Sequence, residues 1–146
     1  MTILTIENIS LGASASDKSD AIKQAGQLLA NSNCIKPEYI DGMLAREETM
    51  STYLGNGVAI PHGTHDSIKY IQKSGISVLQ VPEGVEWEED EIAYLIIGIA
   101  SSSDDHIEIL SNLADVIEDE DEAMKMAKTS DPQLILDALS KQPQAE

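Results

Sequence analysis

The 146-residue sequence has few aromatic residues, few positive charges and a single cysteine. Aromatic side chains make up 3% of the chain, and nine Lys and Arg residues stand against 26 Asp and Glu residues, which gives a formal net charge of -17. Such a chain repels phosphate backbones and offers few rings for stacking on bases, so we expect no nucleic acid partner. The acidic runs, such as 83–91, are solvated faces that also attract a basic protein partner.

The lone cysteine, Cys34, excludes an internal disulfide and agrees with a reducing compartment. No apolar run is long enough to cross a bilayer, and the N-terminus lacks the basic start and apolar core of a signal peptide. We therefore expect a cytoplasmic protein without direct membrane insertion. The length and the 42% hydrophobic content fit one domain, 1–146, with a polar tail at about 141–146.

Hydrophobic patterning predicts strands at 2–6, 52–54, 58–60, 76–81 and 93–100. The last strand is a continuous apolar run, which is typical of a strand buried on both faces. The Asn-Gly pair in Gly55-Asn56-Gly57 predicts a hairpin between the second and third strands. Pro82 and Gly84 are expected to end the fourth strand.

Helices are predicted between these strands. The first is capped by Ser16 or Asp17 and stops at 31–33, and the second has Pro37 in its first turn and Ile40, Met43 and Leu44 as its apolar stripe. Three more are expected: one capped by Ser103 or Asp104 that continues to Ile117, and two shorter ones at 122–128 and 131–139. The fold class predicted is α/β (α+β), a single domain with a mixed sheet flanked by helices on both faces.

The stretch LGNGVAIPHGT at 54–64 contains the first candidate for chemistry, His62. Pro61 cannot donate to a sheet ladder and fixes its own φ, so it ends the strand and sets the direction of the next residue. Gly63 lets the chain turn away, which would present the imidazole at the rim as a nucleophile. From this local pattern alone, a surface histidine at a strand end is an equally good interpretation.

His106 and Arg46 are the other two candidates. His106 falls in the first turn of the helix after the buried strand, where unpaired N–H groups and a partial positive charge favour an anion. A core histidine with satisfied hydrogen bonds is the alternative. Arg46 is the only arginine in the chain, and a guanidinium matches phosphoryl oxygens, although an ion pair with a nearby glutamate would also explain it.

A metal site is a competing use of the histidines. His62 and His65 are three positions apart, and His106 or Cys34 could complete a set. The sequence contains neither a Cys-x-x-Cys pair nor a His-Glu-x-x-His helix, so this pattern is weak, and we expect no metal and no cofactor. Nucleophile-elbow and P-loop motifs are also missing.

Three segments carry a family resemblance: TYLGNGVAIPHGT at 52–64, PEGVEWEEDEIAYLIIGIA at 82–100 and DHIEILSNLADVI at 105–117. In this order they resemble the enzyme IIA domain of the bacterial phosphotransferase system, mannitol/fructose class, and are most similar to the mannitol type. The resemblance implies a phosphocarrier that takes a phosphoryl group from the histidine of HPr and passes it to a cysteine of enzyme IIB for mannitol or fructose uptake.

The resemblance also implies roles for the three candidates. His62 matches the phosphorylated histidine of the PHG motif, His106 the second active-site histidine, and Arg46 an arginine that stabilises the phosphoryl group. His65 is not part of the motif. The alternative function is a regulatory module, in which the same chemistry at His62 reports phosphotransferase status to a partner protein.

Overall fold

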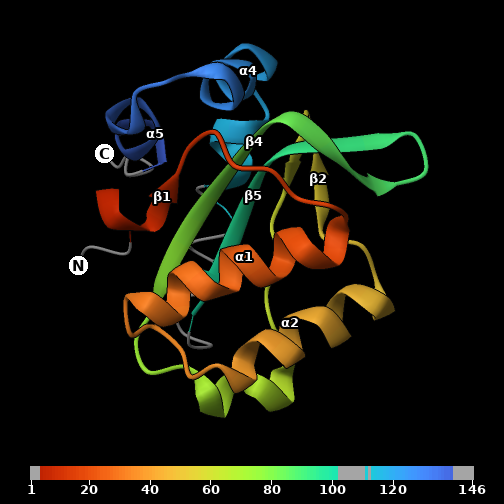
Figure 1. Cartoon of the computed structure of the whole chain (residues 1–146), viewed down its shortest axis with the longest axis vertical. Coiled ribbons are helices and arrows are strands. Elements are labelled where there is room, and N and C mark those ends of the chain that lie inside the picture. The colour runs from red at the N-terminus through yellow and green to blue at the C-terminus, as the bar shows by residue number, and fades with distance from the viewer. Residues whose placement is uncertain (1–3, 102–110, 112, 140–146) are drawn as a thin grey trace.

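The structure is a computed structural model that describes residues 4–101, 111 and 113–139. Its five strands form one sheet in the order β1-β4-β5-β3-β2 (Figure 1). Parallel pairing joins β1 to β4 and β3 to β5, whereas β2–β3 and β4–β5 are antiparallel, so the sheet is mixed. The strands are β1 (Ile9–Ser10), β2 (Tyr53–Gly55), β3 (Val58–Ala59), β4 (Gly75–Glu88) and β5 (Glu91–Ala100).

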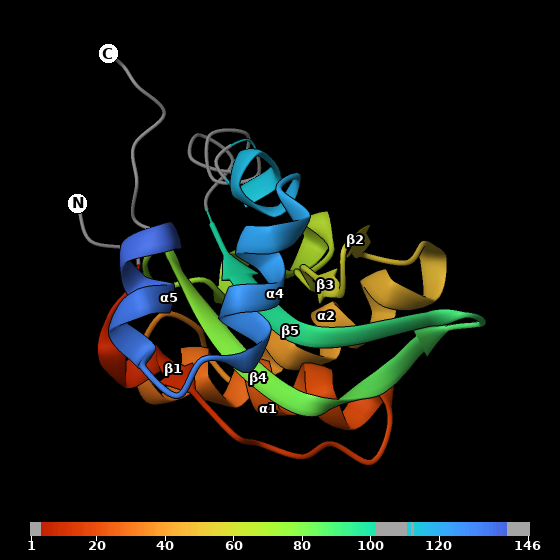
Figure 2. The same ribbon diagram turned by 90° about the horizontal axis from the view of Figure 1, so that it is seen from above.

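Helices cover both faces of this sheet (Figure 2). The helices α1 (Lys18–Asn31) and α2 (Glu38–Thr49) pack on one face. The opposite face holds α4 (Glu120–Lys128), α5 (Pro132–Leu139) and the helical residues 113–117. The predicted fold class, one α/β domain with a mixed sheet flanked on both faces, is confirmed. In the described part of the chain, no helix is both long and apolar enough to cross a membrane.

The central strand β5 is buried on both faces, as its continuous apolar sequence predicts. Leu95, Ile97 and Ile99 belong to the core under α4 and α5. Ile96 and Ala100 belong to the core under α1 and α2. Because side chains alternate along a strand, a strand between two helical layers must be apolar at every position.

The prediction of a first strand at 2–6 is wrong for the residues that the structure describes. Leu4 and Thr5 are irregular, Ile6–Asn8 is a short 3-10 helix, and the strand follows at Ile9–Ser10. Its position is set by parallel pairing of Ile9 with Val78 and of Ser10 with Leu79 in β4. That pairing is a tertiary contact, which the local β-branched pattern cannot locate.

The prediction that Pro82 and Gly84 end the fourth strand is also wrong. The strand β4 continues to Glu88, and its register against β5 shifts between Gln80 and Val85. Pro82 is exposed within this irregular stretch. Because the β4–β5 ladder skips residues there, the strand tolerates a proline, which has no N–H to donate. The result is a long β4–β5 hairpin that projects from the body of the domain (Figure 2).

The hairpin predicted around Asn56 is confirmed. Asn56 and Gly57 have φ angles of 53° and 82°, which the hairpin turn requires and which Asn and Gly tolerate best. The two flanking strands pair through Tyr53 with Ala59 and Gly55 with Val58. This hairpin leads directly into the Pro61–Gly63 segment.

The predicted helices are confirmed where the structure describes them. Asp17 caps α1 by accepting from the N–H of Asp20 at 2.8 Å, and Pro37 stands at the start of α2. The caps proposed at Ser103 or Asp104 lie outside the described residues. Further along that predicted helix, Leu113 and Ile117 are helical and buried.

Candidate functional site

His62 lies at the carboxyl edge of the sheet. It continues β3 beyond its last ladder residue and forms an isolated parallel bridge with Ile99, near the end of β5. The N–H of Ile99 donates to the carbonyl oxygen of Pro61 at 3.0 Å. Since β3 and β5 are parallel, both of their carboxyl ends reach this edge, where α/β folds place ligands. The half-buried His62 is therefore held at the sheet edge through the carbonyl of its neighbour Pro61.

The orientation of the His62 imidazole is set by a backbone carbonyl. Its Nδ1 lies 2.9 Å from the carbonyl oxygen of Ile60. A carbonyl oxygen can only accept, so Nδ1 carries the proton of this hydrogen bond. In the neutral ring the lone pair is then on Nε2, which is the nucleophilic nitrogen of this tautomer.

Hydrogen bonds also connect the end of α2 to this histidine. The carboxylate of Glu47 accepts from the N–H of Thr52 at 3.0 Å and from its hydroxyl at 2.6 Å. The carbonyl oxygen of Thr52 accepts from the N–H of Ile60 at 3.0 Å. Ile60 is the residue whose own carbonyl accepts from His62. A buried glutamate on a helix thus fixes the strand from which the imidazole is presented.

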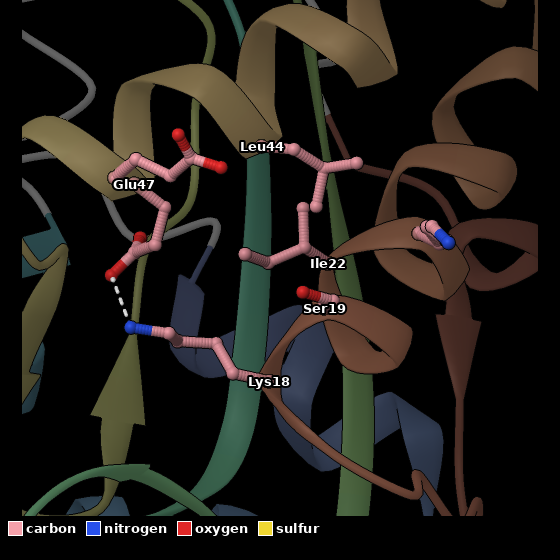
Figure 3. A pocket seen from close by; sticks show the side chains of 7 residues that line it. Lys18, Ser19, Ile22, Leu44 and Glu47 are labelled. Carbon is pink, nitrogen blue, oxygen red and sulfur yellow. Dashed lines mark ion pairs between the residues drawn. The ribbon is translucent and has the colours of Figure 1, made fainter.

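Glu47 is itself held by two more side chains. The indole N–H of Trp87 donates to it at 3.0 Å, and the ammonium group of Lys18 lies 3.6 Å from it (Figure 3). Lys18 also pairs with Glu88 and lies 5.9 Å from the centre of the Trp87 ring. The hollow of about 190 Å³ beside this ion pair is lined by residues of α1 and α2. These contacts brace α2 against α1 and the β4–β5 hairpin.

Tyr39 on α2 contacts the backbone next to His62, and the sequence patterns did not indicate it. Its phenolic oxygen accepts from the N–H of Gly63 at 2.8 Å and donates to the carbonyl oxygen of Ile99 at 2.9 Å. Burial raises the pKa of the Tyr39 phenol above its usual value, and the hydrogen bond from Gly63 offsets part of the rise. The hydroxyl is therefore protonated and donating at neutral pH.

An acidic hollow adjoins the segment after His62. It has a volume of about 320 Å³ and lies between α2 and the 3-10 helix η2 (His65–Tyr70). Three carboxylates, those of Glu38, Asp41 and Asp66, line it, against one ammonium group, that of Lys69. The segment that carries His62 thus adjoins a hollow with an excess of negative charge on one side.

The other predicted site residues are placed as follows. Arg46 lies in the last turn of α2, where its guanidinium donates to the carbonyl oxygen of Met50 at 2.7 Å. His65 is exposed at the start of η2. Cys34 is buried, with its sulfur 3.3 Å from the hydroxyl of Ser32. His106 lies outside the described residues, so its predicted role stays a prediction.

The metal hypothesis finds no support in the part of the chain that the structure describes. No group of three or more His, Cys, Asp or Glu side chains there could hold a metal ion. His106, which the hypothesis also used, is not in that part.

The fold and the site define an α/β domain that presents a histidine, with its Nδ1 hydrogen-bonded to a backbone carbonyl, at the carboxyl edge of a mixed sheet. Residues 2–142 match the family described as "Phosphoenolpyruvate-dependent sugar phosphotransferase system, EIIA 2". The chain belongs to this family. The family predicted from the IPHG and HIEIL segments is therefore confirmed.

Three relatives show how far the similarity extends. A "Multiphosphoryl transfer protein" of Haemophilus influenzae is 48% identical over 90% of this chain, and the match spans 26% of that protein's length. The "Mannitol-specific phosphotransferase enzyme IIA component" of Geobacillus stearothermophilus is 43% identical, with 96% of this chain and 97% of that protein covered. The chain therefore spans about a quarter of the first relative and nearly all of the second.

The third relative is a solved structure. The NMR structure of the complex of enzyme IIAMTL and phosphorylated enzyme IIBMTL from Escherichia coli matches with a TM-score of 0.90 at 38% identity. The match covers 96% of this chain and 99% of that chain. The fold described above is thus that of a solved enzyme IIA.

Proposed function

We propose that this protein is a phosphocarrier of the sugar phosphotransferase system that receives a phosphoryl group from HPr on Nε2 of His62. The observation that carries the proposal is the hydrogen bond from Nδ1 of His62 to the carbonyl oxygen of Ile60. This bond leaves the nucleophilic lone pair on Nε2, at the edge of the sheet where parallel strands end. Family membership supplies the reaction class.

The reaction consists of two phosphoryl transfers. In the first, the lone pair of Nε2 forms a bond to phosphorus while the bond between phosphorus and the histidine nitrogen of HPr breaks. In the second, the thiolate of an enzyme IIB cysteine attacks the same phosphorus, and the electron pair returns to Nε2. The proton on Nδ1 stays on the bond to Ile60 throughout, so the imidazole keeps its orientation.

The transferred group brings negative charge into a chain whose net charge is -17. Local donors must therefore offset the surrounding field. We assign this task to His106, as the resemblance implies, and to Arg46. The Arg46 guanidinium donates one N–H to the carbonyl of Met50, which leaves its other N–H groups for a phosphoryl group.

Mannitol is the sugar that the comparisons favour. The relative covered over nearly its whole length is named as mannitol-specific, and the solved complex pairs a mannitol enzyme IIA with its phosphorylated enzyme IIB. We therefore propose the mannitol enzyme IIB as the acceptor. We also propose that 1–146 is a single enzyme IIA domain and that the protein is cytoplasmic. The free thiol of Cys34 suits a reducing compartment.

A reconstituted transfer chain tests the proposal. The protein is incubated with phosphoenolpyruvate, enzyme I and HPr, and then mixed with the cysteine-containing IIB domain of a mannitol or a fructose permease. We expect an acid-labile phosphoryl gain on the protein, followed by faster transfer to the mannitol IIB. Absence of any gain, with enzyme I and HPr shown to be active on another acceptor, would contradict the proposal.

The regulatory alternative gives a different result in the same system. A regulatory module would be phosphorylated by HPr but would transfer slowly to both IIB domains. It would also bind its partner differently in the phosphorylated and unphosphorylated states, which a pull-down in both states would detect.

A further inference from the structure

The hydroxyl of Tyr39 stands between two strands of the sheet, next to His62. In a parallel bridge between His62 and Ile99, one hydrogen bond joins the N–H of Ile99 to Pro61, and the other would join the N–H of Gly63 to Ile99. The first bond is present at 3.0 Å. In place of the second, the phenolic oxygen accepts from Gly63 at 2.8 Å and donates to Ile99 at 2.9 Å.

The Tyr39 ring also packs tightly against this segment. A Cβ atom added to Gly63 would lie 2.5 Å from Cε1 of Tyr39 and would also collide with the hydroxyl of Ser67. At Gly42, one turn further along α2, an added Cβ would lie 2.5 Å from Cβ of Ser67. The helix and the segment after His62 therefore touch through two glycines, which leaves the segment little room to shift.

The hydroxyl fixes the position of the backbone on the C-terminal side of His62. The backbone on the other side is fixed by the Pro61 carbonyl and by the bond from Nδ1 to Ile60. Tyr39 is buried, so an incoming protein donor cannot contact it directly. Any influence of Tyr39 on transfer must therefore act through the placement of His62.

We propose that Tyr39 is a positioning residue for phosphoryl transfer at His62. The inference rests on the proposed function, because it concerns the rate of that reaction. In-line attack requires Nε2 to face the phosphorus of the donor closely, and small misplacements of a reacting atom slow such reactions strongly. The burial that raises the pKa of the Tyr39 phenol also keeps the hydroxyl in its donating form across the physiological range.

The substitution Tyr39→Phe tests this role because it removes only the hydroxyl. Single-turnover phosphorylation by phosphorylated HPr is followed at increasing donor concentration. The rate at saturating donor should fall by about tenfold, and the donor concentration for half-maximal rate should stay as in wild type. In ¹H–¹⁵N NMR spectra, the amide of Gly63 and the ring nitrogens of His62 should shift.

Tyr53→Phe is the matched control. The Tyr53 hydroxyl makes the same pair of bonds elsewhere, accepting from the N–H of Gly57 at 3.0 Å and donating to the carbonyl of Ile92 at 3.2 Å. Removing the Tyr53 hydroxyl deletes a similar pair of hydrogen bonds but should leave the saturating rate of phosphorylation close to that of wild type. A folded Tyr39→Phe protein with a saturating rate within about threefold of wild type, or no slower than the control, would overturn the inference.

Two further arms keep the result unambiguous. If the Phe variant does not fold, 3-fluorotyrosine is placed at position 39 instead. It keeps the ring but makes the phenolic oxygen a weaker hydrogen-bond acceptor. An unchanged saturating rate in this variant would overturn the inference. Wild type and His62→Ala are run alongside. A wild type that gains no phosphoryl group would overturn the proposed function itself, whereas a normal wild type with a normal Tyr39→Phe overturns only the role of Tyr39.

Discussion

Nδ1 of His62 lies 2.9 Å from the carbonyl oxygen of Ile60, two residues earlier in the chain. Because this bond holds the proton on Nδ1, the phosphorylated form should be the Nε2 isomer. Phosphohistidine isomers differ in their ³¹P and ¹⁵N chemical shifts, so NMR of the phosphorylated protein checks the prediction. A spectrum of the Nδ1 isomer would show that the imidazole ring flips before it reacts, and would contradict the prediction.

Tyr39 should make the stability of the fold fall at high pH. Burial raises the pKa of its phenol above the usual 10.0. At a pH between 10.0 and the raised pKa, the folded protein therefore binds more protons than the unfolded chain. The stabilising contribution is complete below about pH 10 and is lost as the pH rises through the folded pKa. Urea unfolding from about pH 9 to about pH 11 should show a steeper fall for wild type than for Tyr39→Phe. Equal slopes would contradict this.

Substitution of the buried Glu47 by Ala should destabilise the fold more than the same substitution at an exposed glutamate. It would leave Trp87 and Thr52 without a buried acceptor and Lys18 without one of its partners. We expect the free energy of unfolding to fall by about 3 kcal/mol, because buried donors would lose a charged acceptor. Its exposed neighbour provides the control, since Glu48→Ala should change the value by less than about 0.5 kcal/mol. Similar losses for both variants in urea unfolding would contradict the assigned role.

The carboxylates beside the His62 segment should speed the encounter with HPr. Replacing Asp41 and Asp66 by Asn should lower the association rate and flatten its dependence on salt. The control removes two charges in the turn before β5, through Glu89→Gln and Asp90→Asn, roughly 30 Å along the strand from Ile99. Stopped-flow association at several salt concentrations distinguishes the two pairs. Equal effects from both would mean that only the total charge matters.

Much of the fold could be predicted because its elements have local causes. The apolar run of β5, the Asn56 turn and the Asp17 cap each depend on a few adjacent residues. The errors were at β1 and at Pro82, where pairing with a distant strand decides the structure. Helix α2 shows the same limit, because its buried positions include Tyr39 and Glu47 as well as the predicted Met43.

The site was predictable only in part for the same reason. His62 stands in a short motif whose proline and glycine have local effects, so the sequence indicated it. Tyr39 contacts residues 24 and 60 positions away, and Glu47 meets Trp87 40 positions away. No local sequence feature of a tyrosine or glutamate on a helix predicts such a distant partner, so only the folded structure identifies these contacts.

The central claim is that His62 carries the phosphoryl group, and the neighbouring histidine offers the sharpest control. His65 is exposed and only three positions further along the chain. The measurement is intact mass after incubation with phosphoenolpyruvate, enzyme I and HPr, for wild type, His62→Ala and His65→Ala. We predict an acid-labile phosphoryl gain in wild type and His65→Ala and none in His62→Ala. A gain that persists in His62→Ala, or that disappears in His65→Ala alone, would contradict the account.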